Sequence, residues 1–122
     1  NLASRIEALT KTYRSSLLIS HNTFMELHHP LDYAMRLIDR VKVKGKSQMV
    51  SVFEVFDADP PVLKERKLIT KAIFEEALVL YYMEKFSQAA ELFADCLRQN
   101  PMDNVAQIYL ERCIISNRVA SE

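Results

Sequence analysis

The sequence predicts an α+β fold for residues 1–56, followed by an all-α tail of three helices over residues 62–122. The first observation is the only glycine of the 122 residues, Gly45, which separates two runs of strand character. A lone glycine favours a turn with positive φ, so these runs predict a β-hairpin. The second observation is a change of hydrophobic period at Pro60 and Pro61, from the alternation of strands to the spacing of helices. Residues 57–61 are therefore expected to link two parts of different structure.

The first predicted elements are a helix over residues 2–13 and a short buried strand over residues 16–20. In the helix, four apolar side chains recur at helical spacing: Leu2, Ile6, Leu9 and Tyr13. The strand is an apolar run between serines, which is typical of a strand buried on both faces. A second helix is expected over residues 22–27, before Pro30 marks a loop.

The predicted hairpin follows, with strands over residues 33–44 and 49–56. Val41 and Val43 alternate with basic residues, which predicts one apolar face and one cationic face. The second strand is rich in β-branched and aromatic residues, as strands usually are. Four basic side chains are expected to form a solvated face: Arg36, Arg40, Lys42 and Lys46.

After Pro61, apolar residues at helical spacing predict helices over residues 63–84 and 86–97. Pro101 stops the second of these helices, and Asp103 can cap a third. Cys96 and Cys113 fall in the helices without a Cys-x-x-Cys spacing. Reduced thiols in the core are therefore expected, with a single disulfide as the alternative.

The composition excludes several classes of function. Sixteen basic and sixteen acidic side chains cancel, so no overall field attracts nucleic acid. The longest apolar stretch, residues 77–83, is far shorter than the roughly 20 residues that span a bilayer. We therefore expect a cytoplasmic chain without a membrane segment of its own, while an anchor upstream in a longer protein stays open.

Three histidines, His21, His28 and His29, are the residues that suggest a metal site. They lack a carboxylate or cysteine partner at ligand spacing, and adjacent residues point apart on a helix or strand. No metal site is expected there.

Three motifs in combination resemble a known family. Asn1-x-x-x-Arg5 opens the first helix, the serine-flanked strand follows, and Val43-Lys44-Gly45-Lys46 forms the hairpin tip. Together they resemble the C-terminal third of a class III nucleotidyl cyclase catalytic domain, over roughly residues 1–56. The resemblance implies a partial cyclase-type (ferredoxin-like) αβαββ segment from a bacterial adenylate or guanylate cyclase.

For the site, the resemblance implies that Asn1 orients the ribose, that Arg5 stabilises charge on the phosphate, and that Lys44 contacts the triphosphate of ATP or GTP. Arginine suits its role because its planar fork stays charged and grips phosphate oxygens at two points. The alternative for Arg5 and Lys44 is an ordinary position on a solvated basic face.

The resemblance also implies two aspartates that bind Mg²⁺ or Mn²⁺, mostly upstream of the helix that begins at Asn1. The chain is therefore expected to hold no cofactor itself and to be inactive alone, because two-metal phosphoryl chemistry needs ligands for the metals. Class III cyclases work as dimers, so a homodimer is implied.

The helical tail is similar to the tetratricopeptide pattern. Five residues fall on positions of that pattern: Ile73, Ala77, Ala89, Phe93 and Pro101. Leu80 and Cys96 depart from it. One repeat cannot bury its own face, so a protein partner on the tail is one expectation. A non-catalytic cyclase-like module and a free-standing helical adaptor remain as alternatives to the enzyme.

Overall fold

The computed structural model describes residues 2–43, 45 and 47–121. Two compact units divide the chain, Asn1–Pro60 and Pro61–Glu122, which we call unit 1 and unit 2. Unit 1 combines helices with a sheet, and the described part of unit 2 is built from helices. The α+β prediction with a tail of three helices is therefore confirmed.

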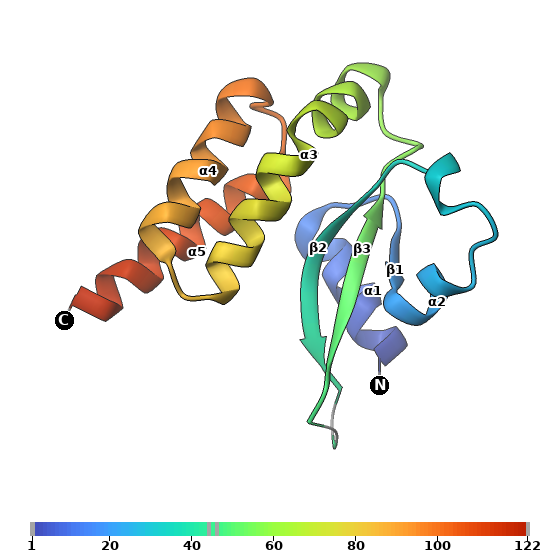
Figure 1. The fold of residues 1–122 in the computed structure, drawn as a ribbon, viewed down its shortest axis with the longest axis horizontal. Helices are drawn as coiled ribbons and strands as arrows, with labels where there is room; N and C mark the ends of the chain where they lie inside the picture. The colour runs from blue at the N-terminus through green and yellow to red at the C-terminus, as the bar shows by residue number, and fades with distance from the viewer. Residues whose placement is uncertain (1, 44, 46, 122) are drawn as a thin grey trace. The chain divides into compact units, whose positions relative to one another are not determined.

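Unit 1 is a three-stranded antiparallel sheet in the order β1-β3-β2 (Figure 1). Its elements are α1 (Leu2–Tyr13), β1 (Leu18–Ser20), α2 (His21–Met25), a one-turn 3₁₀ helix (Pro30–Asp32), β2 (Met35–Lys42) and β3 (Met49–Val55). The helix α1 packs against β1, and α2 packs against β1 and β3. The first hairpin strand starts two residues later than predicted, because the 3₁₀ turn that begins at Pro30 delays it.

The hairpin contains a β-bulge at Ile38. Near the turn Val41 pairs with Val50, whereas beyond the bulge Arg36 pairs with Glu54. The extra residue shifts the pairing by one position, so Arg36 moves to the face of the sheet that carries Val41. The expectation that Arg36 belongs to a solvated basic face is therefore wrong, since its side chain is 0% exposed.

The other basic residues of the predicted solvated face, and the predicted turn, agree better with the structure. Arg40 and Lys42 are exposed, and Lys46 lies outside the described residues. Gly45 has a φ of 82°, in the left-handed region that glycine adopts most readily. The predicted glycine turn is confirmed.

The helix α1 ends in a Schellman motif built without glycine. Arg14 takes the left-handed conformation, with a φ of 53°. The Arg14 N–H donates to the Lys11 carbonyl at 3.3 Å, and the Ser15 N–H donates to the Thr10 carbonyl at 3.1 Å. These bonds satisfy carbonyls that a helix end otherwise leaves open, and they make Ser15 part of the helix terminus.

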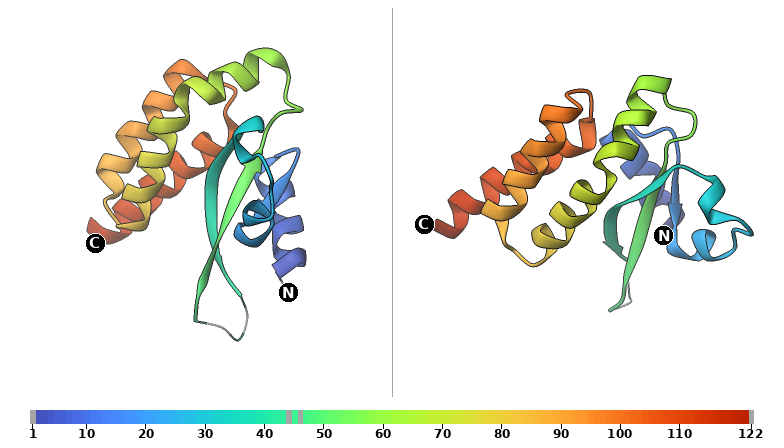
Figure 2. Two further views of the ribbon diagram at one scale, coloured as in Figure 1. Left: turned by 45° about the vertical axis from the view of Figure 1, so that its right-hand side comes forward. Right: turned by 45° about the horizontal axis from the view of Figure 1, so that its top comes forward.

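Unit 2 consists of α3 (Pro61–Tyr82), α4 (Phe86–Gln99) and α5 (Asn104–Ser121), which lie side by side in chain order (Figure 2). Pro61 opens α3 at a position where the missing N–H costs no hydrogen bond. Asp103 accepts a hydrogen bond from the Ala106 N–H at 3.2 Å, so the predicted cap of the third helix is confirmed.

An aromatic cluster fills the centre of unit 2. Phe74, Phe93 and Tyr109 are each 0% exposed. The ring of Phe93 lies 5.6 Å from that of Phe74, edge to face, and 5.3 Å from that of Tyr109, stacked. Such ring pairs add to the free energy of burial. Small residues between the rings let the helices approach: Ala77, Ala89 and Ala106 are fully buried.

Both cysteines are free and buried, as the sequence predicts. Burial disfavours the charged thiolate and raises the pKa of the Cys113 thiol to about 11. Within the part of the chain that the structure describes, no helix has the length and apolar character needed to cross a membrane.

Candidate functional site

Arg5 is the one predicted site residue that the structure describes. It lies on the exposed face of α1, and its guanidinium donates a hydrogen bond to the main-chain carbonyl of Lys42. Lys42 ends β2, two residues before Lys44 in the sequence. Asn1 and Lys44 lie outside the described residues. The structure therefore brings Arg5 to the stem of the hairpin, across 37 positions of sequence.

A cleft of about 480 Å³ opens beside this stem. Its described walls come from the start of α1, the start of α2 and both strands of the hairpin: Leu2, His21, Asn22, Val43, Gln48, Met49, Val50 and Ser51. A cleft of this size accommodates a small ligand. Four of these residues can form hydrogen bonds and none is acidic, so no carboxylate among them repels an anion.

The described residues of the cleft do not suit Mg²⁺ or Mn²⁺. These ions prefer carboxylate oxygens, which the described lining side chains do not offer. Across residues 2–43, 45 and 47–121, no group of three His, Cys, Asp or Glu side chains could hold a metal. His21 lines the cleft and stands beside Asn22, so its imidazole is available there for hydrogen bonding.

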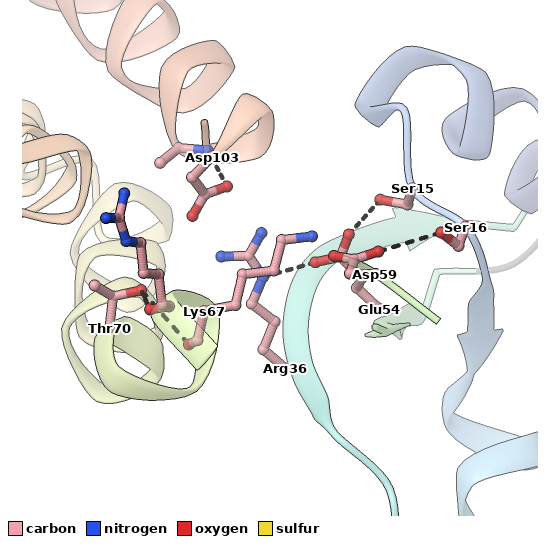
Figure 3. Close-up of polar contacts among 10 residues, drawn as sticks. Ser15, Ser16, Arg36, Glu54, Asp59, Lys67, Thr70 and Asp103 are labelled. Atoms are coloured by element: carbon pink, nitrogen blue, oxygen red, sulfur yellow. Dashed lines mark hydrogen bonds and ion pairs between the residues drawn. The ribbon is translucent and has the colours of Figure 1, made fainter. Parts of the chain in front are cut away.

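A buried ion pair joins the two strands of the hairpin at the end of the ladder away from the turn. Arg36 Nε lies 2.7 Å from Glu54 Oε1, and the two side chains are 0% and 1% exposed. The Ser15 hydroxyl donates to Glu54 Oε2 at 2.7 Å. In Figure 3, Ser15 and Arg36 point at the Glu54 carboxylate from opposite sides.

A second polar contact ties α1 to the same sheet. The Tyr13 hydroxyl donates to Asp39 Oδ2 at 2.6 Å, and Tyr13 is only 1% exposed. Tyr13 was predicted as an apolar contact of the helix, and its ring is buried as expected. The hydroxyl adds a directional bond to β2.

Sequence reasoning missed the ion pair and most of the cleft. Arg36 and Glu54 face each other only because of the bulge at Ile38, which has no clear signature in the sequence. His21 was considered only as a metal ligand. Gln48 and Ser51 belong to the hairpin, and the signal that could have drawn attention to them is their position close to the glycine turn.

Comparison with known proteins finds relatives of one kind. The chain is 35% identical over 115 residues to an adenylate cyclase from Dictyostelium discoideum described as terminal-differentiation specific. It is 48% identical over 56 residues to an adenylate cyclase from Anabaena cylindrica. The alignments cover 93% and 45% of this chain.

The chain spans only a small part of these relatives, 5% of the first and 11% of the second. No protein-family model matches the chain, and no solved structure matches it. The two relatives establish that the chain contains a cyclase-related region.

Proposed function

We propose that this cyclase-related chain is the C-terminal part of a class III nucleotidyl cyclase catalytic domain, which converts ATP or GTP to a cyclic nucleotide and pyrophosphate. In the proposal Arg5 stabilises charge on the reacting phosphate, Asn1 orients the ribose, and Lys44 contacts the triphosphate. A bacterial source and a homodimer stay part of the proposal, as does the tetratricopeptide-like character of the tail.

The observation that carries the proposal is the contact of Arg5 with the hairpin stem. The guanidinium reaches the Lys42 carbonyl, next to the Val43 wall of the cleft. Arg5 of α1 therefore lies at the stem of the hairpin whose turn carries Lys44 in the sequence, and the proposal assigns that lysine to the same phosphate site. This arrangement supports a site for a phosphate group, which needs positive charge from more than one direction.

The proposed chemistry of Arg5 is electrostatic. As the ring closes and pyrophosphate leaves, negative charge builds up on the oxygens of the reacting phosphate. The N–H groups of a fixed guanidinium bind that charge more tightly in the transition state than in the ground state. The Lys42 carbonyl holds the guanidinium at the hairpin before substrate arrives, which limits its loss of side-chain freedom on binding.

The proposal places the ligands of Mg²⁺ or Mn²⁺ outside these 122 residues. The chain alone is then expected to form no cyclic nucleotide, because phosphoryl chemistry of this type depends on the metal ions. Cyclase activity is therefore measured in a longer cyclase that contains these 122 residues.

The test replaces Arg5 by alanine in that longer protein. We expect kcat to fall by about 10²–10³-fold with a much smaller change in KM, since the contact acts in the transition state. Arg5→Lys does not restore the rate, because a point charge lacks the two-point grip. The control is Lys11→Ala, which removes an exposed cation from the same helix. Full activity of Arg5→Ala contradicts the proposal.

A second candidate function is protein interaction without catalysis. Several apolar side chains on unit 2 are more than half exposed: Val62, Ile69, Val79, Ile115 and Val119. A partner protein that covers these side chains would remove apolar area from water, which is the observation behind this candidate. Arg5→Ala distinguishes the two candidate functions, because it lowers kcat in the first and leaves partner binding unchanged in the second.

A further inference from the structure

We infer that the buried Arg36–Glu54 pair, acting through Ser15, positions α1 so that Arg5 meets the hairpin stem. This inference rests on the proposed role of Arg5. It assigns a positioning role to three residues that lie well away from Arg5 in the sequence and contact no substrate in the proposal.

Glu54 is the centre of the arrangement because its two oxygens are used by two different elements. Oε1 receives Arg36 Nε from β2 at 2.7 Å, and Oε2 receives the Ser15 hydroxyl from the end of α1 at 2.7 Å (Figure 3). Glu54 itself stands on β3, the central strand of the sheet. One carboxylate therefore connects α1, β2 and β3.

Stability alone does not account for such a pair. Charged residues are rarely this deeply buried, and apolar side chains of similar volume often stabilise a core as well or better. A charged pair differs from an apolar pair in direction, because its hydrogen bonds are satisfied at one geometry. The Ser15 bond to Glu54 therefore restricts where the end of α1 lies on the sheet.

The link from Ser15 to the helix is rigid. The Ser15 N–H closes the terminus of α1 on the Thr10 carbonyl, so Ser15 moves together with the last turn. Two residues earlier, Tyr13 adds its 2.6 Å bond to Asp39. Two directional bonds thus fix the C-terminal end of α1 to the hairpin.

The opposite end of α1 carries the proposed function. The helix has 12 residues, which makes it a rod about 18 Å long. A change of tilt at the Ser15 end therefore displaces Arg5 near the other end. A displacement of about 1 Å at a reacting group can lower a rate by about 10²-fold, so the buried pair matters for the geometry of the site.

The test uses the 122-residue chain and two adjacent serines. Ser15→Ala removes the bond to Glu54, while Ser16→Ala removes a bond of the same chemistry, from an exposed hydroxyl to Asp59 at 3.2 Å. Amide hydrogen exchange is measured across α1 and β3, together with nuclear Overhauser contacts between Arg5 and Lys42. Ser15→Thr, which keeps the hydroxyl, tests rescue.

For Ser15→Ala we expect amide protection in α1 to fall at least about tenfold relative to β3, with loss of the Arg5 contacts to the hairpin. Ser16→Ala leaves both unchanged, and Ser15→Thr restores them. Tyr13→Phe, which keeps the buried ring, gives a smaller loss of the same kind. A fall in protection shared equally by α1 and β3, or retained Arg5 contacts in Ser15→Ala, overturns the inference.

These measurements require no turnover. The activity of Arg5→Ala in the longer cyclase therefore decides the proposed function separately. If that variant is fully active, the proposed function fails whatever the exchange data give. If it is inactive while Ser15→Ala keeps α1 in place, only the positioning role fails.

Discussion

Both units bury apolar side chains, but unit 1 also buries an ion pair between two strands, whereas an aromatic cluster lies at the centre of unit 2. In unit 1 a charged pair, Arg36 of β2 and Glu54 of β3, is buried and bonded through Ser15 to the end of α1. In unit 2 the centre is a set of rings, with Phe93 between Phe74 and Tyr109. Ring contacts tolerate small shifts, whereas a hydrogen-bonded ion pair requires one geometry. The ion pair of unit 1 therefore fixes the position of α1 on the sheet. The aromatic cluster of unit 2 mainly contributes packing between its helices.

The largest expected effect comes from removing one charge of the buried pair. Glu54→Gln removes the carboxylate charge that lies 2.7 Å from Arg36 Nε, and we expect a loss of about 3–5 kcal/mol in the stability of unit 1. The double variant Arg36→Met with Glu54→Leu removes both charges and should return close to the wild-type stability. Denaturant unfolding followed by exchange of unit 1 amides measures both.

The matched change in unit 2 is Phe93→Met. It keeps an apolar side chain in the cluster, so we expect a loss of only about 1–2 kcal/mol from the ring contacts. If Phe93→Met destabilises unit 2 as strongly as Glu54→Gln destabilises unit 1, the ring cluster is as sensitive to substitution as the ion pair, which contradicts the comparison.

An intermediate effect is expected from pH in unit 2. Burial raises the pKa of Cys113 from its ordinary value of 9.0 to about 11. Above pH 9.0 the unfolded chain loses the thiol proton first, so the unfolded state becomes favoured and stability falls as pH rises. The fall runs from about pH 9.0 to about pH 11 and then levels off.

The control is Cys113→Ala, which lacks the titrating thiol. The difference in unfolding free energy between wild type and variant, followed against pH, isolates the thiol from other groups that titrate in this range. A difference that stays constant from pH 8 to pH 11 contradicts the assignment.

The smallest expected effect is a gain in stability at one helix C-terminus in each unit. Arg14 and Glu84 are exposed and have φ angles of 53° and 60° at the ends of α1 and α3. Both helices close with the same Schellman bonds, and in α3 the Lys85 N–H donates to the Leu80 carbonyl at 2.9 Å. Glycine adopts this conformation without strain, so Arg14→Gly and Glu84→Gly should each stabilise by about 0.5–1 kcal/mol.

Alanine at the same two positions keeps the strain and removes only an exposed side chain. Arg14→Ala and Glu84→Ala are therefore expected to leave the melting temperature almost unchanged. A melt in which the alanine variants gain as much as the glycine variants points to the side chains as the cause.

Most of the fold was predictable because its signals are local. Gly45 and the alternating valines mark the hairpin, and Asp103 marks the start of the last helix. The face of Arg36 was not predictable, because the bulge at Ile38 depends on how the whole ladder pairs. Counting back from the turn in regular register would place Arg36 opposite Val55, and would leave Glu54 opposite Leu37.

The candidate site was predictable only in part. The resemblance to cyclases drew attention to Arg5, and the structure brings Arg5 to the hairpin. The residues that support it, Ser15 and Tyr13, lie at the other end of the same helix and looked ordinary in the sequence. Their partners Glu54 and Asp39 are 39 and 26 positions away, a separation that periodicity does not bridge.

The bond between Ser15 and Glu54 also affects the order in which unit 1 can form during synthesis. The ribosome releases α1 before β3, because Glu54 follows Ser15 by 39 residues. A helix of 12 residues is only marginally stable by itself in water. The hairpin has a short turn and closes quickly once both strands are released. The strand β3 thus pairs with both other strands and also supplies Glu54, the partner of Ser15. The helix α1 can form this stabilising contact only after β3 has left the ribosome.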